Sequence, residues 1–149
     1  MVFKLNISEK EKSWKLDIDS EVLVGKKIGE TFQGKEISAN LEGYELIITG
    51  ASDIAGFPSK ADIEGPELKA IILKRGWGMH KKPRREGKKK VQTPDGLRLR
   101  KSVRGNQISD KTVQINIKVS KAGKKHLQEI FPEQNKPKET APKVAAPAQ

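Results

Sequence analysis

The feature that most constrains the fold of this chain is a run of apolar residues at every second position near residue 115. The run consists of Val113, Ile115, Ile117 and Val119, with Gln114, Asn116 and Lys118 between them. Side chains of a β-strand point alternately to opposite faces, so this pattern predicts a strand with one buried face. The same alternation occurs in residues 3–7 and 14–18, with a polar loop at 8–12 between them. These two segments are predicted to form a hairpin on the same core.

Shorter signals of secondary structure lie between these strands. Residues 46–48 and 68–73 are apolar runs bounded by Gly or Pro, which indicates two buried strands. Ser20 is a suitable N-cap for a short helical turn over residues 21–28. Together these elements suggest a small barrel or a strongly curved sheet.

A short helix is expected after the last strand, with Ser120 as its N-cap. Its apolar residues Leu127, Ile130 and Phe131 are spaced so that they share one helical face. Beyond them Pro recurs every five residues among Lys and Ala, so residues 132–149 are predicted to be a disordered tail. The expected fold class is mainly β with short helices (β or α+β). It is a small antiparallel β-barrel-like domain over residues 1–131, with a long basic insertion and a short C-terminal helix.

The net charge of +11 is concentrated in one segment of the chain. Residues 74–104 contain thirteen Lys and Arg against two acids, which is a local net charge of +11, and the rest of the chain is neutral by count. All six Arg lie in this segment. Because Arg binds phosphate with a planar fork and Lys also serves as a general solubilising charge, this segregation indicates recognition of a polyanion. The alternative is a solvated basic loop.

Residues 74–105 are therefore the candidate nucleic-acid-binding segment. The candidate contacts are Lys74, Arg75, Trp77, His80, Lys81, Lys82, Arg84, Arg85, Lys88, Lys89, Lys90, Arg98, Arg100, Lys101, Arg104 and Gly105. The Arg are expected to bind phosphates or guanine edges, the Lys to supply a diffuse field, and Gly105 to allow close backbone approach. Trp77 either stacks on unpaired bases or caps the preceding strand. The segment lacks an apolar period, so it is expected to be a long insertion without regular structure, and residues 81–105 are expected to be mobile until they bind RNA.

Several classes of function are excluded by what the sequence lacks. The chain has no Cys and only two His, so a disulfide framework, a metal site and redox chemistry are not expected. Ile54 occupies the position where a nucleophile elbow needs Gly, and Gly76-Trp77-Gly78 is a lone GxG without the next Gly. No apolar run approaches the roughly 20 residues of a membrane span. We expect no enzyme activity, cofactor, small-molecule substrate or membrane contact.

Residues 48–59 resemble the signature of the archaeal and eukaryotic ribosomal small-subunit protein six family, which is unrelated to the bacterial protein of that number. The family pattern is Gly-Gly-x-Asp followed by Gly-Phe-Pro-Met. The matching residues here are Gly50, Asp53, Gly56, Phe57 and Pro58. Residues 3–8, 82–87 and 100–106 match further family stretches in the same order. Two positions depart from the pattern, where Ala51 replaces the second Gly and Ser59 replaces Met.

The resemblance implies a structural constituent of the small ribosomal subunit that supports translation in the cytoplasm. Its partners would be small-subunit rRNA and neighbouring ribosomal proteins, and its length is similar to that of archaeal members. Within the signature, Phe57 is expected to fill the core, Pro58 to fix a turn and Gly56 to supply conformational freedom. The rival interpretation is a chromatin-like protein that binds nucleic acid outside the ribosome with the same charge.

Overall fold

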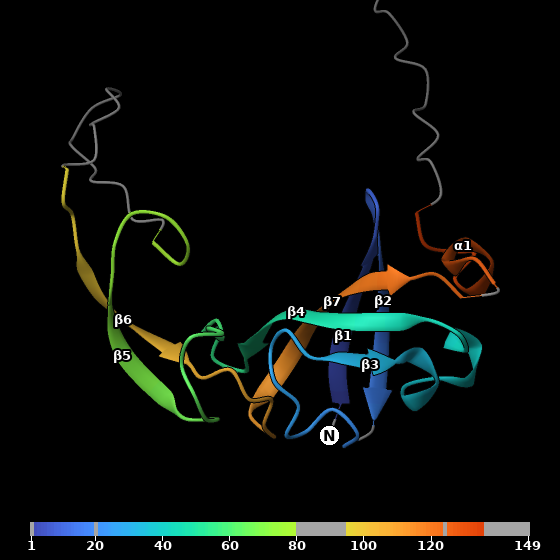
Figure 1. The fold of residues 1–149 in the computed structure, drawn as a ribbon, viewed down its shortest axis with the longest axis horizontal. Coiled ribbons are helices and arrows are strands. Elements are labelled where there is room, and N and C mark those ends of the chain that lie inside the picture. Colours follow the sequence, from blue (N-terminus) through green and yellow to red (C-terminus); the bar gives the residue numbers. More distant parts are fainter. Residues whose placement is uncertain (1, 20, 80–94, 124, 136–149) are drawn as a thin grey trace, which may run out of the picture.

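The computed structural model describes residues 2–19, 21–79, 95–123 and 125–135. These residues form a five-stranded sheet, a two-stranded ribbon and short helices (Figure 1). The strands are β1 (Val2–Glu9), β2 (Lys12–Asp19), β3 (Thr31–Gln33), β4 (Glu45–Asp53), β5 (Leu68–Leu73), β6 (Leu99–Arg104) and β7 (Thr112–Lys121). The helices are α1 (Leu127–Ile130) and two 3-10 helices, Gly34–Glu36 and Ala39–Leu41.

The five-stranded sheet has the order β2-β1-β7-β4-β3 and carries the main core on one face. β1 and β2 form an antiparallel hairpin in which Ile7 lies opposite Trp14, and β1 runs parallel to β7 with Ile7 opposite Ile117. The strand residues of this core are Phe3, Leu5, Ile7, Trp14, Ile18, Phe32, Leu46, Ile48, Ile115 and Ile117. The strands predicted from alternation at 3–7, 14–18 and 113–119 are therefore confirmed, and they share one core.

The mainly β fold class with a short C-terminal helix is confirmed, but the pairing of the main sheet is mixed. β1 and β7 are parallel, whereas β4 is antiparallel to β7. Alternation shows which side chains are buried and carries no information about the direction of the neighbouring strand. In the described part of the chain the sheet runs openly from β2 to β3, without closure into a barrel.

The helical turn expected over residues 21–28 is wrong, because this segment forms turns that bond to a distant loop. Gly25 and Gly29 have φ angles of 89° and 91°, which only Gly adopts readily. The N–H of Gly25 donates to the carbonyl of Ile108, and that of Ile28 donates to Asn106, both at 2.9 Å. Carbonyl groups of the loop at residues 106–108 thus accept hydrogen bonds from N–H groups that a helix would have bonded within itself.

The C-terminal helix exists, but it begins at Leu127 and not near Ser120, because β7 continues to Lys121. Leu127 is buried, and Ile130 and Phe131 pack against the main core as their spacing predicted. The predicted disordered tail starts too early, since Gln134 forms hydrogen bonds with both backbone groups of Lys15, at 2.7 and 2.8 Å. Residues 136–149 lie outside the described residues. No helix in the described part of the chain is long and apolar enough to cross a membrane.

β5 and β6 pair antiparallel as a separate two-stranded ribbon, which we call the arm (Figure 1). Two expectations fail here, because β5 was expected to be a buried strand and residues 99–104 to lack structure. One face of the arm packs on a small second cluster, whose buried members are Leu73, Met79 and Val103. Ile63, Ile71, Leu97 and Leu99 pack around them. A two-stranded ribbon covered on one side leaves the other face of β5 exposed.

Phe57 does not fill the core as the sequence suggested. It is half-buried, and it belongs to neither of the two hydrophobic clusters of the described residues. Phe3, by contrast, is fully buried at the centre of the main core.

The two Phe therefore provide a matched test of the core. Phe3→Ala should lower the free energy of unfolding by about 3–5 kcal/mol, because it leaves a cavity in the packed core. Phe57→Ala should lower it by less than half as much. Urea denaturation of both variants measures this, and equal losses would contradict the assignment of the core.

Candidate nucleic-acid interface

The arm is joined to the main sheet by a buried ion pair between Asp53 and Arg104. Asp53 is the last residue of β4 and Arg104 the last residue of β6, and both are less than a tenth exposed. Arg104 Nε donates to Asp53 Oδ2 at 2.8 Å, and a second guanidinium nitrogen contacts the same oxygen. The remaining nitrogen donates to the carbonyl of Pro66 at 2.7 Å. One side chain thus connects β4, β6 and the segment that leads into β5.

Backbone hydrogen bonds around this pair fix the signature loop against the arm. The N–H of Arg104 donates to Pro58, and the N–H of Lys60 donates back to the carbonyl of Arg104, at 3.0 and 2.9 Å. The N–H of Asp53 donates to the carbonyl of Phe57 at 3.0 Å. Pro58 follows the turn at residues 54–55 and pairs with Ser52 in an isolated bridge. Gly56 has a φ of 83°, a value that needs the conformational freedom expected of it.

The ionisation of Asp53 is set by two opposed effects. Burial alone would raise the pKa of its carboxyl group. The hydrogen bonds from Arg104 and from the N–H of Ala55, together with the Arg104 charge, outweigh burial and lower the pKa below its ordinary value. Asp53 is therefore a carboxylate at neutral pH, and the guanidinium of Arg104 is neutralised inside the protein. Arg104, a candidate RNA contact from sequence, is occupied by this internal role.

Gly105 allows a close backbone approach, but the neighbouring backbone belongs to the same chain. A Cβ atom at Gly105 would lie 1.8 Å from the carbonyl oxygen of Gly65, so only Gly fits. Its N–H donates to Glu67 at 3.0 Å. Gly50 has no such constraint, since a Cβ there meets no atom within 4 Å and its φ is not positive. It lies at an irregularity in the register of β4 with β7.

The two departures from the family pattern are accommodated locally. Ala51 is buried and its φ is not positive, so a side chain is tolerated there, as expected. Ser59 is also buried and its N–H donates to the carbonyl of Ala51 at 2.9 Å.

Exposed cations gather at the arm tip, the end of the arm formed by residues 74–79 and 95–98. Lys74, Arg75 and Arg98 line an open depression of about 250 Å³, together with Asp95, Gly96 and Leu97. Trp77 is 51% exposed and is not packed in the second cluster. Lys101 Nζ donates to the carbonyl of Gly78 at 2.9 Å, which holds the turn that carries Trp77.

Part of the predicted segment is not placed. His80, Lys81, Lys82, Arg84, Arg85, Lys88, Lys89 and Lys90 lie outside the described residues. Arg100 is exposed on β6, on the opposite face of the arm from the second cluster. Sequence reasoning missed the two internal roles of Arg104 and Gly105, because their partners Asp53 and Gly65 are remote in the chain.

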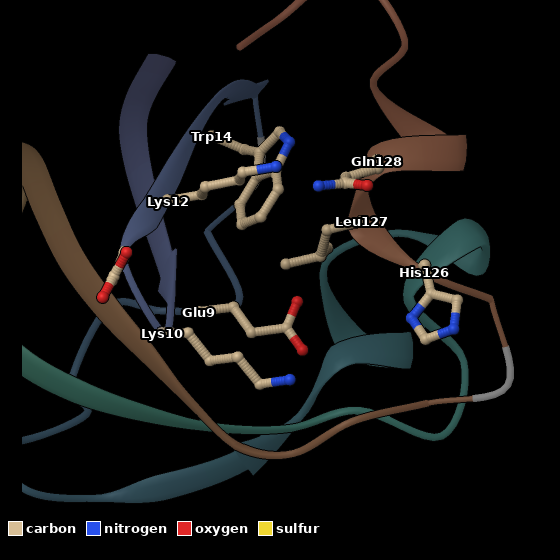
Figure 2. A pocket seen from close by; sticks show the side chains of 8 residues that line it. Glu9, Lys10, Lys12, Trp14, His126, Leu127 and Gln128 are labelled. Atoms are coloured by element: carbon tan, nitrogen blue, oxygen red, sulfur yellow. The ribbon is translucent and has the colours of Figure 1, made fainter.

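A second depression, of about 430 Å³, lies between the β1–β2 turn and α1 (Figure 2). Its apolar wall is formed by Trp14 and Leu127, which Figure 2 shows facing its interior. Its rim carries both Lys and Glu side chains, contributed by Glu9, Lys10, Glu11 and Lys12. Because the two signs of charge alternate, this site lacks the cationic character of the arm tip.

The ion pair at the junction predicts a large effect of a small change. Asp53→Asn should lower the free energy of unfolding by about 3–5 kcal/mol, because it leaves the buried guanidinium of Arg104 without its counter-charge. Asp110→Asn, at an exposed position, should change stability by less than about 0.5 kcal/mol. Denaturant unfolding at neutral pH compares the two, and equal effects would contradict the role of the pair.

The same pair has a defined pH dependence. Because the pKa of Asp53 is lowered in the folded state, its contribution is fully present above the unfolded value of roughly 3.9 and is lost as the pH falls further. The stability difference between the wild type and Asp53→Asn should therefore be constant at neutral pH and shrink below about pH 4. A difference that grows with acidity would refute this assignment.

The two Gly offer another matched pair. Gly105→Ala should lower the free energy of unfolding by about 1–3 kcal/mol or more, because its Cβ clashes with fixed backbone. Gly50→Ala should be neutral or slightly stabilising, since nothing opposes the added methyl group. Thermal unfolding of both variants distinguishes them, and a tolerated Gly105→Ala would show that the close approach to Gly65 is not required.

Comparison with known proteins agrees with this geometry. The model of the ribosomal protein S6e family matches residues 3–132. The small ribosomal subunit protein eS6 of Methanosphaera stadtmanae is 41% identical over 136 residues, which cover 89% of this chain and 95% of the relative. The eS6 protein of Methanothermobacter thermautotrophicus is 43% identical over 134 residues, with 88% and 96% covered, and that of Nanoarchaeum equitans is 40% identical over 129 residues, with 87% and 80% covered. The resemblance seen in the sequence is confirmed, and the chain belongs to the ribosomal protein S6e family as an archaeal member.

Proposed function

We propose that the chain is a structural constituent of the small ribosomal subunit and binds rRNA through the arm tip. The observation that carries the RNA contact is the gathering of Lys74, Arg75 and Arg98 around one open depression. Three cations face a single acid, Asp95, at this site. None of the three cations forms an ion pair with a described residue. Their charges are free for an external anion.

The chemistry of the arm tip suits a single-stranded or irregular RNA. Arg75 and Arg98 can each bind a phosphate with two parallel hydrogen bonds, and Lys74 adds a point charge. Trp77, with its ring exposed beside these cations, can stack on an unpaired base. Residues 80–94 connect Met79 to Asp95, and both of these residues belong to the arm tip. Its seven Lys and Arg are therefore attached at the same place, and they stay candidate contacts.

Arg104 and Gly105 are not included among the proposed RNA contacts, because both have internal roles. The guanidinium of Arg104 donates its hydrogen bonds to Asp53 and Pro66, and Gly105 is packed against Gly65. Their contribution is to fix the direction of the arm relative to the main sheet. The role is structural, with rRNA and neighbouring ribosomal proteins as partners in the cytoplasm, and it includes no catalytic step, cofactor or metal.

The proposal predicts co-sedimentation with the small ribosomal subunit when cell extract is fractionated on a sucrose gradient and probed for this chain. The chromatin-like rival predicts that the chain sediments with DNA and is released by nuclease that cuts DNA alone. Such release, without any chain in the small-subunit fraction, would exclude the proposed role.

The contact itself can be tested with purified chain and small-subunit rRNA. Neutralising one phosphate contact reduces the slope of log affinity against log salt by roughly 0.7–0.9, so Arg98→Gln should show this reduction together with weaker binding. Lys118→Gln removes an exposed cation from β7, away from the arm tip, and should leave the slope nearly unchanged. Equal effects of the two variants would mean that binding follows overall charge and not the arm tip.

A further inference from the structure

The face of the arm that points away from the second cluster carries a row of aliphatic residues. On β5 these are Leu68, Ala70 and Ile72, which alternate with Lys69 and with the cluster members Ile71 and Leu73. Leu68 is 42% exposed and Ile72 is 68% exposed. Successive residues on one face of a strand lie roughly 7 Å apart, so the three side chains form one continuous strip.

The pairing of β5 with β6 gives this strip defined neighbours on β6. Ala70 lies opposite Ser102, and Ile72 lies opposite Arg100. Ala70 is thus a small residue paired with another small residue, between the larger side chains of Leu68 and Ile72. Arg100 is exposed next to Ile72 and forms no ion pair with any described residue. The face therefore combines an aliphatic strip with one unneutralised guanidinium.

We propose that this face binds a neighbouring protein of the small subunit, through a segment that carries aliphatic side chains and a carboxylate. The aliphatic side chains of that segment cover Leu68, Ala70 and Ile72, and the carboxylate pairs with Arg100. This contact is separate from the RNA contact at the arm tip. It assigns Arg100, a candidate RNA contact from sequence, to a protein partner.

Protein fits this face better than RNA for a chemical reason. RNA is bound by cations that neutralise phosphates and by flat rings that stack on bases, and the strip offers neither. Aliphatic strips exclude water from other apolar side chains, a gain of roughly 25 cal/mol per Å² buried. A charge at the margin of such a strip selects the partner through its complementary charge.

The first test uses a photo-activated cross-linker, p-benzoylphenylalanine, placed at Ile72 of the full chain and assembled into small subunits in cells. Irradiation should give a cross-linked product that is larger than the chain by the mass of a second protein and is unchanged by ribonuclease. The same cross-linker at Trp77 is the control and should give a product that ribonuclease shortens. A ribonuclease-sensitive product at position 72, or no product there when position 77 reacts, would overturn the proposal.

The second test separates the two contacts by their energetics. Ile72→Asp should reduce retention of the chain on small subunits after a high-salt wash by about fivefold or more, as expected for a buried contact residue. Val22→Asp, at a Val that is 45% exposed in the turns at residues 21–28, should be retained like the wild type. Wild-type retention of Ile72→Asp, or equal loss with Val22→Asp, would contradict the docking face.

Arg100→Gln distinguishes this proposal from the RNA contact. It should weaken retention on the subunit while the affinity of the free chain for rRNA stays within about twofold of the wild type. Arg98→Gln should weaken rRNA affinity in the same assay. If Arg100→Gln reduces rRNA affinity as much as Arg98→Gln, Arg100 belongs to the RNA contact and the proposed protein contact loses its charged partner.

Discussion

The buried ion pair between Asp53 and Arg104 is the interaction on which the arrangement of the molecule depends. It lies where the last residue of β4 meets the last residue of β6, at the junction of the two sheets. A pair taken out of water contributes little net stability compared with an apolar pair of the same volume, because desolvation offsets the attraction. The ion pair instead sets the orientation of the arm, since the guanidinium can bond to Asp53 and Pro66 together in only one such orientation.

The remaining features of the junction reinforce that orientation. Gly105 permits the backbone after β6 to pass against Gly65, and the signature loop donates and accepts backbone bonds around Arg104. The signature residues are thus structural in a specific sense. They connect the five-stranded sheet to an arm whose end carries cations that form no ion pair with a described residue, so the proposed RNA contact has a preset direction.

Much of the main sheet could be predicted from the sequence, because strands with one covered face carry a period of two. The alternation around Ile7 and around Ile117 identified both the strands and their buried faces. The arm could not be predicted in this way, because its small core is assembled from single residues of several segments, such as Ile63, Met79 and Leu97. The parallel pairing of β1 with β7 and the turns at 21–28 also depend on distant partners, which local patterns do not contain.

The candidate site shows the same division. Charge concentration identified the region that carries the exposed cations of the arm tip, because clustered Arg are readable in the sequence. The burial of Arg104 could not be predicted from the distribution of charge along the sequence, since its partner Asp53 is 51 positions away. One signal was present, because Asp53 is the only charged residue of the signature at 48–59. A buried carboxylate needs a cation or several donors, and the Arg of the basic segment were the available cations.

The central claim is that the ion pair holds the arm in place and that the main sheet does not depend on it. Native-state hydrogen exchange of the wild type and Asp53→Asn tests this most directly, because it reports the opening of each strand separately. The backbone amides of β5 and β6 should exchange much faster in the variant, while those paired between β1 and β7 should lose only the protection that follows from the global loss of stability. Unchanged protection of β5 and β6, or an equal increase in exchange in every strand, would contradict the account.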